Sequence, residues 1–496
     1  MTATRVPGLP VVEDGVLIST HPATGKEAGR VPVADAAAVE AATARAREAA
    51  RWWQSLGFDG RKERLMRWRS LLARRVEEVA ELTGLEAGKP HADAVVEAAG
   101  AVEHLDWMAR HAKRVLGPRR TATRLLLMEH TGHLEYQPYG VVGVIGPWNY
   151  PILTPMGSIA GALSAGNAVV FKPSEYTPIV GQWLADTFAE VVPEQPVLQV
   201  VHGLGDVGAA LCRSGVNKIA FTGSTATAKK VLAACADNLV PTVIEAGGKD
   251  AIIVDDDADV DAAAEAAVWG AMTNAGQTCI GIERAYAVAP VYDAFVAAVV
   301  EKAGKLRTGD QIGPITMPRQ LDIIREHIDD ALAKGGRAVL GGAEAVQPPY
   351  VAPTVLVDVP ADARGIREET FGPTLTITKV ADAEEALQQA NGTSYGLGGA
   401  VFGKRNAIRI ARRLRSGMVA VNGTLTFSGM GNLPFGGVGD SGFGRIHGED
   451  GLREFARPKA ITVRRGPSLL PAMTFERTPG QVATIIRALK ILYGRR

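Results

Sequence analysis

The segment Val141-Val-Gly-Val-Ile-Gly-Pro-Trp-Asn-Tyr-Pro151 decides the fold class of this 496-residue chain. It begins as a short apolar run and ends in a loop that two prolines interrupt, which is typical of a buried strand followed by a turn. A helical stretch near residues 155–165 and a second apolar run at 168–172 come next. Strand, helix and strand in this order predict a parallel sheet.

The same alternation continues on the C-terminal side. Further strands are predicted at residues 197–202, 218–222 and 242–245, with helices at 180–191, 206–213 and 225–236 between them. A second alternating block covers about 249–433, with strands at 251–254, 285–288, 352–357 and 374–380 and helices at 262–272 and 291–306. These patterns predict an α/β chain with a doubly wound sheet, which binds ligands beyond the carboxyl ends of its strands.

Residues 36–116 have helical spacing and predict a set of helices before the first sheet. Residues 122–139 predict a hairpin, in which Leu125, Leu127, Leu134 and Tyr136 flank a Thr-Gly turn. A two-stranded ribbon is marginal alone in water, so this hairpin requires another surface to cover it. The glycine-rich run 429–444 predicts a connector that returns the chain to the first sheet.

Composition excludes several classes of protein. The formal net charge is +1 and 22% of the residues are charged, so no basic face for nucleic acid is indicated. The apolar stretch 141–171 is interrupted by prolines and asparagines and is not expected to span a membrane. Three cysteines cannot form a disulfide framework in a chain of this length, and the first residues lack a secretory signal. We therefore expect a reducing, cytoplasmic environment.

Two short segments carry candidate chemistry. Cys279 ends Asn274-Ala-Gly-Gln-Thr-Cys279, and Glu245 opens Glu245-Ala-Gly-Gly-Lys249. A thiolate can attack a carbonyl carbon, and a carboxylate can then activate the water that hydrolyses the acyl-enzyme. The backbone amide of Cys279 lies among small residues outside any predicted strand, so it can donate to an oxyanion. Cys212 and Cys235 are interpreted as inert buried residues.

Together with Pro147-Trp148-Asn149-Tyr150-Pro151, these segments resemble the NAD(P)-dependent aldehyde dehydrogenase superfamily, over about residues 15–465. The resemblance implies that Cys279 is the nucleophile and that Asn149 donates its side-chain amide to the oxyanion. It implies that Glu245 is the general base, although Ala246 replaces the leucine that is usual in this segment. The departure leaves the carboxylate and the two glycines intact.

The resemblance also implies a cofactor site. The turn Phe221-Thr-Gly223-Ser224-Thr225 would face the pyrophosphate at a helix N-terminus, although Ala228 replaces a usual glycine. The literal G-x-G-x-x-G at residues 203–208 lacks the acidic residue that should follow it, so we expect it to be structural. NAD is favoured over NADP because a carboxylate at the adenosine ribose repels a 2′-phosphate, but NADP remains possible. The implied cofactor residues are Trp148, Lys172, Glu175, Gly223, Ser224, Glu369 and Phe371.

The resemblance divides the chain into six segments. Residues 1–121 form the helical and N-terminal part of the NAD-binding domain, and 122–139 form an oligomerisation hairpin. Residues 140–246 form the Rossmann-like NAD-binding domain, and 247–433 form the catalytic domain. Residues 434–457 return to the NAD-binding domain, and 458–496 form an oligomerisation strand and tail. A homodimer or homotetramer is expected.

The expected activity is oxidation of an apolar aliphatic or aromatic aldehyde to a carboxylic acid through a cysteine thiohemiacetal and thioester. Alternatives are a semialdehyde dehydrogenase (acting on succinate semialdehyde, for example), a CoA-acylating or phosphorylating relative, and a catalytically silent binding or structural protein. No metal-binding motif is present. The apolar positions of residues 482–492 predict a helix that docks on a neighbouring subunit or contacts a membrane surface. The expected pocket walls, from residues 154–159, 269–273 and 424–431, include Met156, Trp269, Met272, Leu425, Phe427 and Met430.

Overall fold

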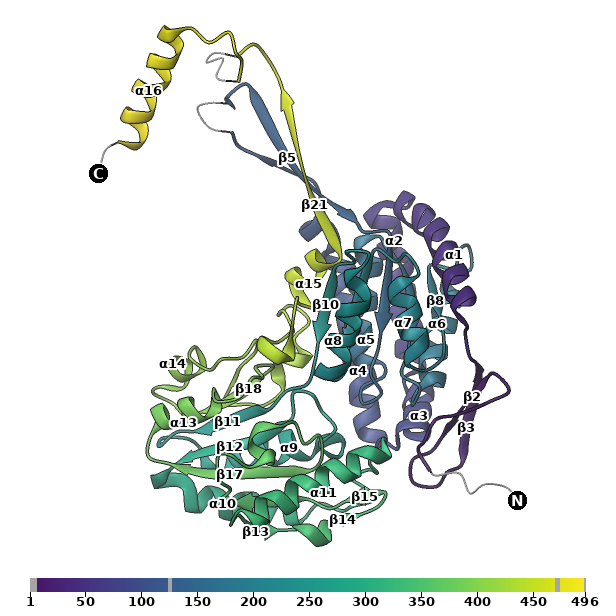
Figure 1. Cartoon of the computed structure of the whole chain (residues 1–496), viewed down its shortest axis with the longest axis vertical. Helices are drawn as coiled ribbons and strands as arrows, with labels where there is room; N and C mark the ends of the chain where they lie inside the picture. The colour runs from purple at the N-terminus through teal and green to yellow at the C-terminus, as the bar shows by residue number, and fades with distance from the viewer. Residues whose placement is uncertain (1–6, 124–126, 469–472, 495–496) are drawn as a thin grey trace.

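The computed structural model describes residues 7–123, 127–468 and 473–494. Two large sheets, each with helices packed on it, lie next to each other, and a thin ribbon projects from the body (Figure 1). The α/β class with parallel sheets predicted from the alternating pattern is confirmed.

The first sheet has six strands in the order β20-β10-β9-β6-β7-β8. All neighbours are parallel except β20, which runs antiparallel to β10. The chain order reverses between β6 and β9, so a crevice opens at the carboxyl ends of these strands. The strands are β6 (Val141–Ile145), β7 (Ala168–Lys172), β8 (Leu198–Val200), β9 (Lys218–Thr222), β10 (Thr242–Glu245) and β20 (Gly442–Phe443).

Helices cover both faces of this sheet. One group contains α1, α7 and α8, and the other contains α2, α4 and α5, with α3 and α6 packed beside it. Both groups enclose one core of apolar side chains from strands and helices, including Trp53, Trp68, Phe171 and Phe188. The helices are α1 (Ala36–Ser55), α2 (Gly57–Arg74), α3 (Val76–Ala87), α4 (His91–Leu116), α5 (Leu153–Ala165), α6 (Pro178–Val191), α7 (Gly205–Arg213) and α8 (Thr225–Ala236).

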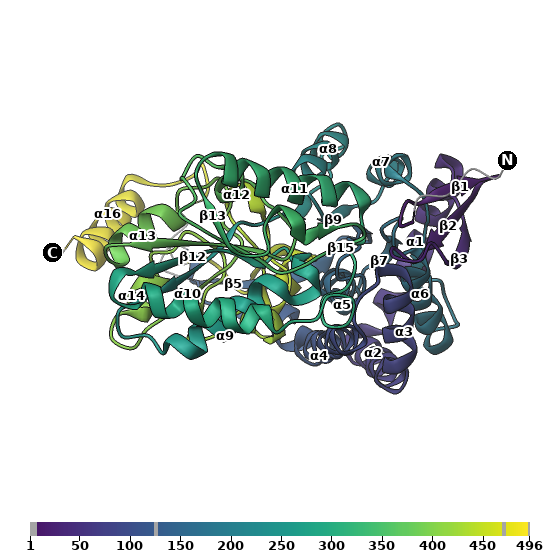
Figure 2. The ribbon, with the colours of Figure 1, turned by 90° about the horizontal axis from the view of Figure 1, so that it is seen from below.

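The second sheet has seven strands in the order β13-β16-β17-β12-β11-β18-β19. It is parallel except for β13, and it is seen from below in Figure 2 with its helices. The strands are β11 (Asp250–Val254), β12 (Ile282–Val288), β13 (Arg337–Leu340), β16 (Thr354–Val357), β17 (Thr374–Val380), β18 (Gly399–Phe402) and β19 (Ala420–Val421). The helices are α9 (Val260–Met272), α10 (Ala289–Gly304), α11 (Pro318–Ala333), α12 (Arg364–Arg367), α13 (Ala383–Ala390) and α14 (Ala407–Ala411).

Three smaller groups of strands complete the sheet structure. An antiparallel sheet near the N-terminus contains β1 (Val11–Glu13), β2 (Val16–Thr20) and β3 (Glu27–Pro32). A short pair joins β14 (Val346–Gln347) and β15 (Tyr350–Val351). The projecting ribbon contains β4 (Arg119–Thr121), β5 (His130–Pro138) and β21 (Ala456–Arg464).

The predicted hairpin is wrong in its strand positions. Thr131 and Gly132 lie inside β5, where Gly132 pairs with Thr121 of β4 on one side and Thr462 of β21 on the other. A Cβ on Gly132 would come within 2.1 Å of the Thr121 hydroxyl, so the glycine permits close strand pairing and does not make a turn. Leu125, one of the predicted strand residues, lies outside the described residues.

The C-terminal helix α16 (Pro479–Tyr493) stands away from the body beyond the ribbon (Figure 1). Thr478 caps it in a capping box with Gln481, and none of its residues is buried. Within the described residues, every helix is too short or too polar to cross a bilayer. The stretch 141–172 forms β6, a loop, α5 and β7.

Candidate active site

Two cavities meet at Cys279. The larger has a volume of about 480 Å³ and follows the carboxyl ends of β6, β7 and β9. The smaller has a volume of about 80 Å³ and contains Glu245 in its wall. Cys279, Ala246 and Thr222 line both cavities. A thiol at such a junction can contact ligands that enter from either side.

The loop before Cys279 is held by an unusual backbone. Asn274, Ala275 and Gly276 have φ values of 52°, 55° and 71°, in the left-handed region that side chains rarely adopt. A Cβ on Gly276 would lie 2.1 Å from the Gly372 backbone, so only glycine fits there. The Gln277 side chain stabilises the turn. Its Nε2 donates to the backbone oxygen of Asn274 at 3.0 Å, and its Oε1 accepts from the Thr316 backbone amide at 2.8 Å.

Asn149 lies beside this loop. Its Nδ2 donates to the backbone oxygen of Gln277 at 2.9 Å, and its own backbone oxygen accepts from Asn274 Nδ2 at 3.0 Å. The next residue, Tyr150, is bonded through its hydroxyl to Thr278 Oγ1 at 2.9 Å. The loop after β6 and the loop of Cys279 are thereby joined by side-chain hydrogen bonds.

A buried ion pair supports the Asn149 loop from α4. Lys89 and Glu97 are fully buried and paired with each other, and the Lys89 ammonium lies 3.9 Å from the Tyr150 ring centroid. Glu97 also accepts from the Ile152 amide at 2.8 Å. Removing one partner would leave a buried charge unpaired, which makes this pair a structural constraint on the loop.

The Cys279 side chain is half-buried, whereas Cys212 and Cys235 are buried. Burial raises the pKa of the Cys279 thiol, and the negative charges of Glu369, Asp250 and Glu245 add to the effect. Among the described residues, no acceptor takes the Cys279 N–H, so this amide can donate to an oxygen bound beside the sulfur.

Glu245 is the last residue of β10 and is 3% exposed. Within the described chain, neither carboxylate oxygen has a hydrogen-bond partner. Burial raises the pKa of Glu245 well above the ordinary carboxyl value of 4.5, Arg445 opposes this rise, and Glu454 adds to it. Such a carboxyl is suited to accept a proton near neutral pH.

The large cavity contains the predicted cofactor residues of the first sheet. Lys172 ends β7, is 4% exposed, and lies 3.6 Å from Glu175. Ser224 is the N-cap of α8 and accepts from the Thr227 amide, and no acidic residue occurs in the first turn of that helix. Gly223 lines the same end of the cavity. A helix N-terminus, a cation and a glycine turn together fit a pyrophosphate and its ribose.

The G-x-G-x-x-G segment lies nearer to this cavity than the sequence interpretation anticipated. Gly205 and Gly208 line the cavity together with Cys212 of α7. Gly208 lies against the Lys172 side chain, where a Cβ would be 3.6 Å from its Cδ. The first turn is therefore part of the cavity wall as well as of the helix packing.

Glu369 and Phe371 enter the cavity from the second sheet. The Glu369 carboxylate accepts from the Gly248 amide at 2.9 Å, and burial raises its pKa to about 8. Phe371 and Trp148 are in T-shaped contact, with ring centroids 5.6 Å apart. Phe371 has a φ of 54°, so this segment is held in a strained conformation by its surroundings.

Sequence reasoning missed the residues that hold this segment. Glu283 accepts from the amides of Thr370 and Phe371 at 2.8 and 2.9 Å and is ion-paired with buried Lys249. Lys249 also donates to the Thr370 hydroxyl at 3.1 Å. Lys249 belongs to the Glu245 motif and lies just before the apolar strand predicted at 251–254, and a lysine beside a buried strand is the signal that could have identified a buried partner.

The predicted substrate pocket is partly wrong. Leu425 lines the small cavity as expected, but Met156, Trp269, Met272, Phe427 and Met430 do not. Met156 and Met272 point into the core, and Trp269 is 47% exposed. Met156, Trp269 and Met272 lie on α5 and α9, where helical spacing identifies apolar residues but not which face meets the cavity. Phe427 is buried in the core of the first sheet and Met430 is exposed. The apolar wall consists of Leu153, Ile280, Leu397, Leu425, Phe435 and Ile446.

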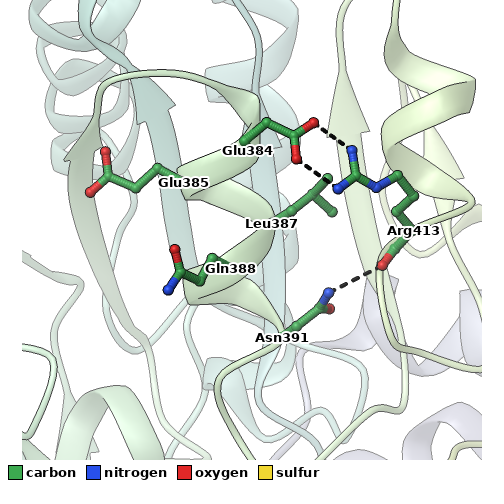
Figure 3. A pocket seen from close by; sticks show the side chains of 6 residues that line it. All are labelled: Glu384, Glu385, Leu387, Gln388, Asn391 and Arg413. Atoms are coloured by element: carbon green, nitrogen blue, oxygen red, sulfur yellow. Dashed lines mark hydrogen bonds and ion pairs between the residues drawn. The ribbon is translucent and has the colours of Figure 1, made fainter.

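Two other groups of polar residues do not belong to this site. A surface hollow on α13 is lined by Glu384, Glu385 and Arg413, among others, and Figure 3 shows Glu384 paired with Arg413. The consecutive residues Asp255, Asp256 and Asp257 could hold a cation by spacing alone, but Asp257 already accepts from the Lys404 and Arg405 amides. Neither group contains a nucleophile such as the Cys279 thiol at the junction of the two cavities.

Comparison with known proteins agrees with this geometry. Residues 13–461 match the model of the family described as "Aldehyde dehydrogenase family". The chain belongs to the aldehyde dehydrogenase family. Family members use NAD(P) and oxidise aldehydes, so this chain is an NAD(P)-dependent oxidoreductase that acts on an aldehyde group.

Individual relatives of this aldehyde dehydrogenase carry different names. A protein of Mycobacterium ulcerans (strain Agy99) described as "Putative succinate-semialdehyde dehydrogenase (NADP(+)) 2" is 36% identical, over 95% of this chain and 94% of its own. The 4,4'-diapolycopene aldehyde oxidase of Methylomonas sp is 35% identical, over 89% of this chain and 84% of its own. The crystal structure of an NAD-dependent aldehyde dehydrogenase from Sinorhizobium meliloti is 32% identical, with a TM-score of 0.87 and coverage of 92% of both chains.

Proposed function

We propose that this aldehyde dehydrogenase oxidises an apolar aliphatic or aromatic aldehyde to a carboxylic acid with NAD, through a thioester on Cys279. The observation that carries the proposal is the position of Cys279 between a long cavity and a small, mainly apolar one. A thiol at that junction can contact the substrate carbonyl from one side while the cofactor occupies the other.

The residues of the long cavity fit a dinucleotide. Ser224 and Gly223 would face the pyrophosphate, Lys172 and Glu175 would hold the adenosine ribose, and Glu369 would hold the nicotinamide ribose. Phe371 and Trp148 would pack near the nicotinamide. The cofactor, when bound, accepts the hydride that leaves the substrate carbon. We propose a preference for NAD because the Glu175 carboxylate would repel a 2′-phosphate.

The chain's own residues carry the other steps. Cys279 Sγ attacks the carbonyl carbon, the thiol proton passes to solvent, and the carbonyl oxygen of the resulting thiohemiacetal takes the negative charge. Asn149 Nδ2 and the Cys279 N–H donate to the oxygen of this adduct. After the carbon is oxidised to a thioester, Glu245 takes a proton from a water molecule, which attacks the thioester and releases the acid and the thiol.

The semialdehyde alternative is favoured by the name of the Mycobacterium ulcerans relative. A semialdehyde carries a carboxylate, which requires a cation near the far end of the substrate. Among the described side chains that line the small cavity, there is no lysine or arginine. We therefore propose an uncharged aldehyde as the better substrate, and a hydrolytic rather than CoA-acylating outcome because Glu245 provides the base.

We also propose that the chain works as a homodimer or homotetramer in the cytoplasm. The ribbon of β4, β5 and β21 projects from the body (Figure 1) and requires a covering surface. The segments 122–139 and 458–496 would then serve assembly, while 140–246 bind the cofactor and 247–433 complete the catalytic site. The three free cysteines fit a reducing compartment.

A kinetic panel tests the substrate assignment. NADH formation is followed with hexanal, benzaldehyde and succinate semialdehyde, with NAD and NADP, and with CoA present or absent. We expect kcat/KM to be highest for the uncharged aldehydes with NAD, with the free acid as product even when CoA is present. Preferential oxidation of succinate semialdehyde would overturn the proposed substrate, and formation of acyl-CoA would overturn the proposed hydrolytic outcome.

A further inference from the structure

His447 is a polar side chain in the wall of the small, mainly apolar cavity. Its side chain is buried, with the residue 3% exposed, and among the described residues neither ring nitrogen has a hydrogen-bond partner. Of the side chains that line this cavity, Glu245 and His447 alone have such unpartnered buried atoms in the described chain. The proposed reaction uses Glu245 as the general base, whereas it gives His447 no role.

The position of the ring is built by several elements. His447 stacks on His104 of α4, with ring centroids 3.7 Å apart and planes inclined by 15°. His104 is anchored through Nε2, which lies 2.8 Å from the Ser428 backbone oxygen. On the other side, Gly157 of α5 leaves room for the ring, because a Cβ there would come within 2.7 Å of His447 Nε2.

The backbone at His447 is also unusual. Its φ of 62° and ψ of 163° lie in a region that is essentially restricted to glycine, at the start of α15 (Gly448–Glu454). The flanking Ile446 is held by two backbone hydrogen bonds with Phe435, at 2.6 and 2.9 Å. Strained conformations of this kind concentrate at ligand-binding positions. A glycine would relieve the strain, so a side chain here requires another explanation.

The ring can be matched to one ligand chemistry. Burial, together with His104, holds the pKa of His447 well below its ordinary value, so the imidazole is neutral. A neutral imidazole offers one N–H donor and one acceptor nitrogen. A hydroxyl group can both donate and accept, so it can bond whichever of the two ring nitrogens it meets. A carboxylate can only accept, and in this mainly apolar cavity its charge would be buried without a lysine or arginine among the described lining residues, whereas an alkyl group can neither donate nor accept.

We propose that His447 is a specificity-determining residue that hydrogen-bonds a hydroxyl group on the substrate, so that the preferred aldehydes carry a hydroxyl remote from the aldehyde carbon. This inference rests on the proposed function, because it places the substrate in the small cavity. It narrows the substrate class from apolar aldehydes to aldehydes with an apolar body and a hydroxyl end. A site that hydrogen-bonds a substrate hydroxyl disfavours the analogue that lacks it, because the polar group of the site is left unpaired.

The test compares matched substrates. One series contains benzaldehyde, 4-methylbenzaldehyde and the 3- and 4-hydroxybenzaldehydes, and the other contains straight-chain alkanals with and without a terminal hydroxyl. For the wild-type enzyme, we expect at least one hydroxylated member to exceed its unsubstituted and methylated analogues in kcat/KM by roughly 10-fold to 100-fold. If no hydroxylated aldehyde in either series is preferred, the proposal is wrong.

Variants separate specificity from structure. His447→Phe keeps a ring against His104 but removes both nitrogens, so the kcat/KM advantage of the hydroxylated member of each pair should be lost. His447→Asn restores a donor and an acceptor and should recover part of the preference. His111→Phe, on the same helix α4 but stacked on Trp107 and outside the cavity lining, is the control and should change both members of a pair equally. Retention of the full preference by His447→Phe would overturn the proposal.

Failure of the broader function has a different signature. If no aldehyde of either series is oxidised by the wild type in a Cys279-dependent manner, the proposed reaction itself is wrong. If unsubstituted aldehydes are oxidised with Cys279 dependence but hydroxyl groups bring no advantage, only the role of His447 is wrong. The wild-type measurements decide between these outcomes even if one variant fails to fold.

Discussion

Asn149 donates its side-chain Nδ2 to the backbone oxygen of Gln277 at 2.9 Å, two residues before Cys279. Asn149 lies in the loop after β6 of the first sheet and Gln277 in the loop before β12 of the second, so this bond joins the two loops and holds the Asn149 amide near the Cys279 loop. Asn274 donates to the same Gln277 oxygen at 3.2 Å, so the loop keeps one tether when Asn149 is changed.

Replacing Asn149 with alanine should therefore lower kcat more than it lowers stability. The loss of one oxyanion donor corresponds to about 2.7–4 kcal/mol of transition-state stabilisation, or on the order of 10²–10³ in kcat. Steady-state kinetics and thermal unfolding measure the two effects. Asn391→Ala is the control, because Asn391 lies in the remote surface hollow of Figure 3 and bonds the Arg413 backbone. A wild-type kcat in Asn149→Ala would contradict the role of Asn149 as an oxyanion donor.

Glu245 should act after hydride transfer. In Glu245→Gln, the first turnover should still produce a burst of NADH, because this step requires only Cys279 and the oxyanion donors. The steady state should slow by roughly 10²–10⁴, the range typical of general-base catalysis. Rapid-mixing absorbance at the NADH wavelength resolves both phases. Equal losses in burst and steady state would place Glu245 in the first half of the reaction instead.

The pH dependence of the steady state follows from the raised pKa of Glu245. A base acts only when deprotonated, and burial has moved this deprotonation well above 4.5. The deacylation rate should therefore increase as the pH rises through the raised pKa and reach a plateau above it. The Glu245→Gln variant should lack this increase in the deacylation rate. In both proteins, the pH dependence of the burst should follow ionisation of the Cys279 thiol, whose pKa is also raised by burial. Identical deacylation profiles in the two proteins would contradict the assignment.

The projecting ribbon predicts self-association. Light scattering at micromolar concentration should give a mass at least twice the 52.2 kDa of one chain. Leu134 of β5 pairs with Arg119 and Ala460 of the neighbouring strands, so Leu134→Arg should reduce the mass by placing an additional charge on the ribbon. A wild-type monomer with full activity would contradict the expected assembly.

Much of the architecture could be predicted from sequence because it depends on local pattern. The strands at Ala168–Lys172, Lys218–Thr222, Thr242–Glu245 and Thr374–Val380 begin and end where apolar runs meet glycine, proline or polar residues. The ribbon could not be predicted in this way. Its central strand, β5, pairs with β21, a segment more than 300 residues later, and a long-range partner leaves no signal in local periodicity.

The site residues also divide into those that local sequence motifs identify and those that only the folded structure identifies. Cys279, Glu245 and Asn149 lie in motifs with distinctive small neighbours, and the structure brings all three to the walls of the two joined cavities. Lys249, Glu283 and the pair His104 and His447 were not predicted as site residues. Their importance comes from burial and from contacts between distant elements, which a single sequence does not display.

The central claim is that Cys279 alone carries the acyl group. The most direct test is mass spectrometry of Glu245→Gln quenched after mixing with NAD and benzaldehyde, because slowed hydrolysis should leave the thioester in place. The account predicts a benzoyl mass increment on the peptide that contains Cys279, none on Cys212 or Cys235, and no adduct in the Cys279→Ala, Glu245→Gln double variant. An acyl group on another residue, or NADH formation that persists in Cys279→Ala, would contradict it.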